Sequence, residues 1–346
     1  PKANRSYFYP SVSGAIAFTE LMGDARPEWL SFGKIRASWA EVGKGTNPYE
    51  TVTTLWPVGT YLDGAVGLGN SWTRGNPYLK PEKTRSFEIG LEMRFLQNRA
   101  KFDIAYYNNK SVNQILSPRG PQSTGYIFCS INAGTVHNKG LEITLSGTPV
   151  QTRDFTWETS LNAAGNRGTM TDLPEGMDIM YVTDVKYGSA KAATFSGGDF
   201  MAIAGTKWAR VDDNETNRKY NPDMIGKLIL DKNGMPQAAE SSKIYEVANR
   251  EPKFTGGWNN TLTWKNWTFN MLWEFRVGGG VFNGTKYAMT MTGTSEFSAD
   301  IRNQPLTIAG VQGTTVTADD GTSYTKYSDV SNTWTPGETC VFNGQT

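Results

Sequence analysis

The sequence predicts an all-β chain that forms part of a large antiparallel transmembrane β-barrel. Three observations support this prediction. Segments of about ten residues alternate between apolar and polar side chains, which is typical of strands with lipid on one face and water on the other. Short and long connections alternate between these segments. Glycine, at 37 of 346 residues, and aromatic residues, at 12%, are both abundant.

The clearest predicted strand covers residues 85–95. Its odd positions from Phe87 to Phe95 are all apolar, whereas its even positions are polar or small. Successive side chains of a strand point to opposite sides, so one face would meet lipid and the other water. Residues 96–98 predict a tight turn into a second strand at 99–108, which is the antiparallel partner of the first.

Weaker alternation predicts the remaining strands and brings the number visible to about eight. A slip in the pattern near Gly33 predicts a β-bulge there. These further strands are expected at residues 7–18, 29–42, 139–147, 155–163, 253–264 and 267–277.

The connections between the strands predict which rim of the barrel faces which side. In an up-and-down sheet alternate connections lie at the same end, and outer-membrane barrels have short periplasmic turns and long extracellular loops. Within the longest loop, local strands are expected at 199–211 and 227–230, with a turn at 232–234. Short links are expected at residues 19–28, 96–98, 148–153 and 265–266, and long irregular ones at 43–84, 118–137, 165–251 and after residue 278.

Charge and hydropathy limit the class of protein. The formal net charge is +1, which argues against a nucleic-acid-binding protein because such a protein carries a basic surface. No run of about 18 apolar residues exists, so no transmembrane helix is expected. The mean hydropathy of −0.47 is compatible with a barrel, because only every second wall residue meets lipid. The start at Pro1 shows no secretory signal and is expected to lie within a loop.

Aromatic residues gather toward the ends of the predicted strands. In a membrane they would form two girdles at the level of the headgroups. The alternative is that they pack the core of a soluble protein. The residues concerned are Phe8, Tyr9, Phe18, Trp29, Trp39, Phe87, Phe95, Trp264, Trp267 and Phe275.

No catalytic, cofactor or metal site is expected, and the chain is not expected to be an enzyme. His137 is expected in the loop before Lys139 and has no partner at ligand spacing. Residues 212–215, Asp-Asp-Asn-Glu, could bind a divalent cation, but they lack the glycine and terminal glutamate of a calcium loop, so a solvated loop tip is preferred. The glycines at 278–280 are expected to end a strand rather than hold phosphate. Cys129 and Cys340 are expected to be unpaired thiols.

Two groups of side chains remain as candidates for ligand contacts, although no single substrate-binding residue is predicted. Charged residues of the predicted inner faces would line an aqueous interior, and aromatic residues of the loops could stack on sugars or bind a protein partner. The inner-face residues are Glu88, Glu92, Arg94, Lys101, Asp103 and Glu142, and the loop residues are Trp56, Tyr61, Trp72, Tyr181, Tyr187, Trp208 and Tyr220.

One segment also resembles a known family. NPYLKPEKTRSFEIGLE, at residues 76–92, closely resembles a segment of SusC/RagA-type TonB-dependent transporters. The resemblance continues through YYNNK at 106–110, QIL at 114–116, NAG at 132–134 and NKGLE at 138–142. FYPSVS at 8–13 and SFGKIRAS at 31–38 are similar to barrel strands of the same family. These matches cover most of residues 5–150.

The resemblance implies an outer-membrane importer of bulky nutrients, either oligosaccharides or peptides. Such an importer works with a SusD-like surface lipoprotein and is driven by the TonB–ExbB–ExbD complex, which contacts an N-terminal region. In this family a plug closes a barrel of about 22 strands. Neither the plug nor the final strands are expected within residues 1–346, which would form one partial barrel domain in contact with outer-membrane lipid and not with nucleic acid.

Two other functions stay open at this point. The chain could be a secreted carbohydrate-binding β-protein, if the apolar faces of its strands bury against each other. It could also be a surface adhesin with a purely structural role.

Overall fold

The computed structural model describes residues 7–60, 64–182, 190–240 and 243–335. The chain forms two compact units. The first contains Pro1–Thr183, Ala192–Ala202 and Ala248–Gly280, and the second contains Asp184–Lys191, Ile203–Val247 and Val281–Thr346. The predicted wall strands all belong to the first unit.

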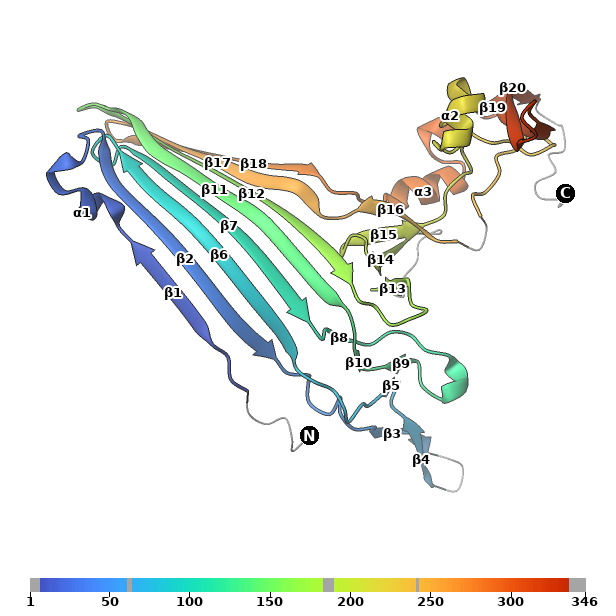
Figure 1. Cartoon of the computed structure of the whole chain (residues 1–346), viewed down its shortest axis with the longest axis horizontal. Helices are drawn as coiled ribbons and strands as arrows, with labels where there is room; N and C mark the ends of the chain where they lie inside the picture. Colours follow the sequence, from blue (N-terminus) through green and yellow to red (C-terminus); the bar gives the residue numbers. More distant parts are fainter. Residues whose placement is uncertain (1–6, 61–63, 183–189, 241–242, 336–346) are drawn as a thin grey trace. The chain divides into compact units, whose positions relative to one another are not determined.

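An eight-stranded antiparallel sheet dominates the first unit (Figure 1). Its strands lie side by side in the order in which they follow along the chain, as in an up-and-down barrel wall, so the prediction of about eight strands is confirmed. They are β1 (Ser11–Ile16), β2 (Leu30–Lys44), β6 (Glu82–Phe95), β7 (Ala100–Val112), β11 (Thr135–Gln151), β12 (Phe155–Thr171), β17 (Pro252–Trp264) and β18 (Trp267–Gly278).

Several strands extend further toward the long connections than the alternating pattern predicted. Strands β11 and β12 each have 17 residues, whereas the pattern predicted nine in each. Apolar alternation ends where the outward-facing positions become polar, but the ladder of backbone hydrogen bonds does not require apolar side chains. His137 therefore lies within β11, not in the preceding loop as predicted.

The tight turns at 96–98 and 265–266 lie where they were predicted, whereas most of the link predicted at 148–153 belongs to β11, which ends at Gln151. Leu96, Gln97 and Asn98 all adopt positive φ angles, of 51°, 57° and 69°, between β6 and β7. Trp264 pairs with Trp267, which makes residues 265–266 a two-residue turn between β17 and β18. The bulge in β2 lies between Leu30 and Phe32, slightly before the predicted position near Gly33.

Gly33 has a different role. The connection after β1 contains a short helix, α1 (Phe18–Met22), that the sequence pattern did not predict. A side chain at Gly33 would collide with the ring of Phe18, since a Cβ there would lie 2.1 Å from its Cζ. The buried Thr19 hydroxyl accepts a hydrogen bond from the Gly33 N–H at 3.0 Å and donates to the Gly33 carbonyl at 3.3 Å. These contacts complete the backbone pairing of β2 beyond the end of β1.

The long connections were predicted to be irregular, but they contain short strands and helices. Residues 43–84 contain a hairpin, β3 (Leu55–Thr60) and β4 (Val66–Asn70), followed by β5 (Thr73–Arg74). Later connections contain η3 (Gln122–Thr124), β8 (Ile115–Leu116), β9 (Phe128–Cys129), β10 (Ile131–Asn132), β13 (Ile179–Tyr181), β14 (Lys191–Phe195), β15 (Ala202–Gly205) and β16 (Tyr245–Asn249), and η2 (Gly23–Ala25) follows α1. Such short strands have too few residues for alternation to be visible in the sequence.

The second unit has its own small core. Its hairpin, β19 (Leu306–Thr317) and β20 (Ser323–Trp334), lies in the region after residue 278 that was predicted to be irregular. The Leu230 N–H donates to the Val311 carbonyl, and the Val311 N–H donates to the Leu228 carbonyl. Leu230 and Val311 are both almost fully buried. The other elements of this unit are α2 (Glu215–Tyr220), η4 (Pro222–Met224), α3 (Gly284–Met291) and α4 (Glu296–Asp300). No helix of the described residues has both the length and the apolar character needed to cross a membrane.

Candidate functional site

The two faces of the eight-stranded sheet differ in chemistry. The register places Leu91 between Ile35 and Ile104 on one face, and Glu92 between Lys34 and Asp103 on the other. The same division holds across the sheet, because cross-strand partners point to the same side. We call these the apolar face and the polar face.

The apolar face is exposed to a degree that is unusual for a soluble sheet. The Phe87 and Ile89 side chains are each 43% exposed, and Trp267 at the turn end is 76% exposed. Soluble proteins rarely leave uncovered an apolar surface that extends over several neighbouring strands. The aromatic residues lie at both ends of this face, as predicted: Trp29 stacks on Phe95 at the turn end, with 5.9 Å between ring centroids, and Trp39 pairs with Phe87 toward the loops.

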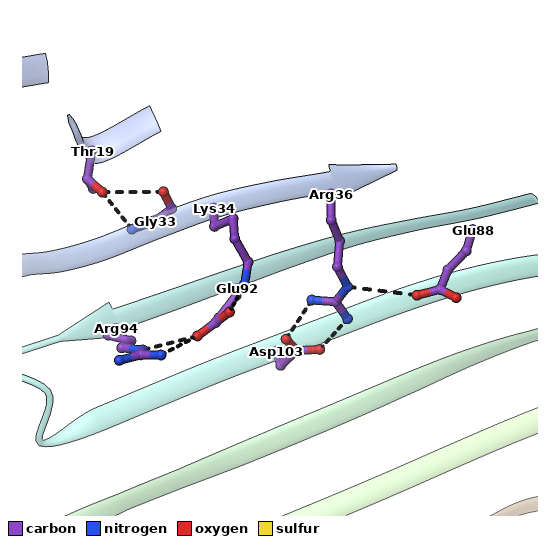
Figure 2. A network of polar contacts seen from close by, with 8 residues as sticks. All are labelled: Thr19, Gly33, Lys34, Arg36, Glu88, Glu92, Arg94 and Asp103. Carbon is purple, nitrogen blue, oxygen red and sulfur yellow. Dashed lines mark hydrogen bonds and ion pairs between the residues drawn. The ribbon is translucent and has the colours of Figure 1, made fainter. Parts of the chain in front are cut away.

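On the polar face an ion pair joins β2 to β7 across the strand between them, β6. Figure 2 shows Arg36 of β2 reaching over β6 to Asp103 of β7, where it donates to both carboxylate oxygens at 2.8 and 2.9 Å. Gly90 of β6 makes this contact possible, since a Cβ at that position would lie 2.6 Å from the Arg36 guanidinium carbon. Glu88 lies 3.8 Å from the same guanidinium.

A second group of charges lies next to it on the polar face (Figure 2). The Glu92 carboxylate forms ion pairs with Lys34 of β2 at 2.7 Å and with Arg94 at 2.7 Å. The cations and carboxylates of this part of the wall therefore compensate one another. Such a wall is hydrated and carries no strong net charge.

A tyrosine repeats the same arrangement two strands further along the sheet. Tyr107 of β7 extends across Gly140 of β11, and its hydroxyl donates to the Asn166 side chain of β12 at 3.0 Å. Asn166 in turn donates to Asn138 and to Glu251, and Glu251 also accepts from the Gly168 N–H at 2.8 Å. The alternating pattern did not predict that Tyr107, Asn138 and Asn166 come together, because a strand pattern does not show which residues meet across a glycine.

A concavity of about 680 Å³ opens on the polar face over β11, β12, β17 and β18. Glu142, Glu274 and Arg276 contribute charges to its lining, and Asn162 and Thr255 contribute hydrogen-bonding groups. Of these, only Glu142 was among the candidates from the sequence. This volume is adequate for a small polar molecule or for part of a larger one.

Two of the segments that carry the family resemblance, residues 76–92 and 132–134, contact each other near the loop end of the sheet. The Asn132 side chain accepts from the Lys80 N–H and donates to the Lys80 carbonyl, both at 2.6 Å. The Asn76 side chain donates to the Ser130 carbonyl at 3.0 Å. Leu79 and Ala133, one from each segment, are both buried. These segments thus fix the start of β6 to the chain before β11 and have a structural role.

The other candidate residues from the sequence form a helix cap, an ion pair or the end of a strand. Asn214 caps α2 by accepting from the Asn217 N–H at 2.8 Å, and Asp213 pairs with Arg218 at 2.6 Å. Gly278 and Gly279 adopt φ angles of 76° and 83° at the end of β18, which fits their predicted role in ending a strand. Among the residues that the structure describes, no three His, Cys, Asp or Glu side chains are grouped so as to hold a metal ion.

The cysteines and loop aromatics have different surroundings. Cys129 is a half-buried free thiol in β9, and Tyr220 stacks on Tyr324 with 4.1 Å between ring centroids. Trp56, Trp72 and Trp208 are each about half exposed or more. Cys340, Tyr61 and Tyr187 lie outside the described residues.

An antiparallel sheet with one charged, hydrated face and one exposed apolar face that is bordered by aromatic residues is the wall of a transmembrane β-barrel. Comparison with known proteins identifies the kind of barrel. The chain belongs to the TonB dependent receptor-like, beta-barrel family, whose model matches residues 1–228. The predicted all-β fold, SusC/RagA resemblance and outer-membrane location are thereby confirmed.

Three relatives illustrate the match. The TonB-dependent receptor P26 of Formosa agariphila is 28% identical over 288 residues, covering 81% of this chain and 29% of that receptor. SusC of Bacteroides thetaiotaomicron is 33% identical over 162 residues, covering 46% of this chain and 15% of SusC. The solved RagAB peptide transporter superposes with a TM-score of 0.66 at 22% identity, over 87% of this chain and 33% of that one.

The chain spans less than a third of the length of the curated relatives it matches. The curated relatives are named as TonB-dependent receptors, and the solved RagAB structure is named as a peptide transporter.

Proposed function

We propose that residues 1–346 form part of the wall of an outer-membrane transporter that imports bulky nutrients, either oligosaccharides or peptides. The division of the sheet into a charged face and an exposed apolar face carries this proposal. Ion pairs such as Arg36–Asp103 keep the interior hydrated without a strong net charge. A lumen of this kind admits large polar solutes of either sign.

The open edges of the sheet support the proposal that further strands complete the barrel. Strands β1 and β18 are the two edge strands, each paired on one side only. Within a membrane an unpaired edge leaves backbone groups without hydrogen-bond partners, which costs several kcal/mol for each group. We propose that additional strands from outside residues 1–346 pair with these edges. We also propose that a plug domain closes the lumen.

The proposed partners are the TonB–ExbB–ExbD complex, acting through the plug, and a SusD-like lipoprotein that covers the loops. The second unit supports the lipoprotein contact, because it gives the long connections a folded structure. Its hairpin is held to the preceding loop by Lys227, which pairs with Asp329 at 2.7 Å, and by Asn221, whose side chain bonds the backbone of Thr325 and Tyr327. Ordering a loop in this way costs conformational entropy, and contacts with a bound partner would offset that cost.

Uptake measurements test the transport function. Deletion of the gene for the full-length protein is expected to abolish growth on one class of nutrient, either an oligosaccharide or a peptide, and complementation is expected to restore it. Uptake of the labelled nutrient should also stop when an uncoupler collapses the proton-motive force. Unchanged uptake of both classes after deletion, or uptake that persists with the uncoupler, would contradict the proposal.

A separate experiment tests the lipoprotein contact. Trp208 is 52% exposed in the second unit, and Trp72 is 62% exposed in the first, so the two form a matched pair. Trp208→Ala is expected to weaken co-purification of the lipoprotein about ten-fold or more, as for an aromatic contact residue in an interface. Trp72→Ala serves as the control. Equal co-purification of both variants would show that the second unit does not bind the lipoprotein through this surface.

A further inference from the structure

Three basic residues lie together on the apolar face, at the end nearest the long connections. Lys110 is in β7, Lys139 in β11 and Arg167 in β12, which are neighbouring strands. The register places Lys139 directly opposite Arg167, and Lys110 opposite His137, one pair further along β11. All three basic side chains are exposed. We call them the basic cluster.

The basic cluster begins where the apolar surface ends. One pair closer to the turns on β11, Leu141 lies opposite Tyr106, and these side chains are 41% and 39% exposed. The next pair is Ile143 with Ile104. Side chains at these positions face the hydrocarbon of the membrane, so those of the basic cluster lie at the level of the headgroups.

The basic cluster has no carboxylate at ion-pair distance, unlike several cations of β2 and β6. On the polar face, Arg36 pairs with Asp103 and Lys34 with Glu92. On the apolar face, Lys83 and Arg85 of β6 both pair with Glu41. Within the described part of the chain, none of the three residues of the basic cluster has a carboxylate oxygen within 4.0 Å. Asp172, which accepts a bond from Thr171, lies close enough to Lys110 for their charges to attract each other.

We propose that Lys110, Lys139 and Arg167 bind the phosphate groups of lipid headgroups in the leaflet that borders the long loops. This inference rests on the proposed orientation of the barrel in the outer membrane. Three exposed cations on adjacent strands present complementary charge to a multiply phosphorylated headgroup, and the apolar side chains beside them contact its acyl chains. Arginine and lysine at a membrane surface attract anionic lipid in this way.

A lipid-binding measurement on the full-length protein tests the proposal. The purified protein is titrated with detergent-solubilised lipid A, with and without its phosphate groups, and bound lipid is quantified by native mass spectrometry. Each cation near the headgroup is expected to contribute about a five-fold change in affinity. The triple variant Lys110→Gln, Lys139→Gln, Arg167→Gln should therefore bind phosphorylated lipid A about 100-fold more weakly.

Lys101 provides the matched control. It lies on the same strand as Lys110, is also exposed, and points to the polar face opposite Arg94. Lys101→Gln should leave lipid affinity unchanged. If the triple variant fails to fold, as judged by heat-modifiable migration, the single variants Lys110→Gln and Lys139→Gln should each still show about a five-fold loss.

The outcomes separate the proposal from its alternatives. Equal binding of phosphorylated and dephosphorylated lipid, or unchanged affinity in the triple variant, would overturn it. Competition by excess inorganic phosphate as effective as that of the lipid would show a site for free anions and would also overturn it. Nutrient uptake by the wild-type protein and the triple variant is measured in parallel, so that unchanged lipid affinity in the triple variant together with normal uptake refutes this inference and leaves the transport function standing.

Discussion

The opposite orientation of two adjacent residues, Leu91 and Glu92, allows a direct test of the membrane assignment. Leu91 is the middle residue of the apolar series from Phe87 to Phe95 and therefore lies near the centre of the hydrocarbon. An arginine at such a position costs about 2 to 4 kcal/mol of folding free energy in a β-barrel. We expect Leu91→Arg to lower the free energy of unfolding by this amount.

The change at Glu92 should be milder. Replacing Glu92 by leucine removes its ion pairs with Lys34 and Arg94, both at 2.7 Å, but leaves those cations on a hydrated face. The Lys34 and Arg94 side chains are 33% and 40% exposed, and pairs of this kind contribute about 0 to 1 kcal/mol. Glu92→Leu should therefore cost about 0 to 2 kcal/mol for the two pairs together.

Urea-dependent folding of the full-length protein into lipid vesicles, followed by heat-modifiable migration, measures both free energies. Leu91→Met is the control, since it preserves an apolar side chain of similar volume. If Leu91→Arg and Glu92→Leu shift the unfolding midpoint equally, or Glu92→Leu shifts it more, the apolar face does not contact lipid and the reasoning is refuted.

Three further predictions follow from the structure. First, in a background without native cysteines, cysteines at Asn214 and Gly313 should react with an impermeant thiol reagent in intact cells, and cysteines at the turn residues Asn98 and Asn266 should not; the opposite labelling would reverse the topology. Second, Gly90→Ala should cost about 1 to 3 kcal/mol because its Cβ would displace Arg36 from Asp103, whereas Gly14→Ala, with no atom within 4 Å of the new Cβ, should cost little; equal unfolding free energies would refute this explanation of Gly90. Third, hydrogen bonds from the Thr322 N–H and hydroxyl, followed by the contact with Lys219, hold the pKa of Asp320 below its usual range. This group stabilises the second unit above the pKa of the unfolded chain, so protease resistance of the β19–β20 hairpin should fall as the pH decreases below about 4, and Asp320→Asn should remove that dependence.

Much of the first unit was determined by the sequence alone. A strand that separates lipid from water must alternate, so residues 85–95 showed their two faces and their turn before the structure was known. The turns at 96–98 and 265–266 were predicted for the same reason, because alternation stops and resumes there with the opposite strand direction. The number of wall strands and their order along the sheet then followed from the short connections.

The tertiary structure alone decided which side chains meet across the sheet. Arg36 reaches Asp103 only because the strand between them has no side chain at Gly90, and Tyr107 reaches Asn166 over Gly140 in the same way. The basic cluster is equally invisible along the chain, since Lys110, Lys139 and Arg167 come together through the pairing register. Alternation is a local property that each segment shows by itself, whereas these contacts join residues up to 67 positions apart and depend on register, which the sequence pattern does not determine.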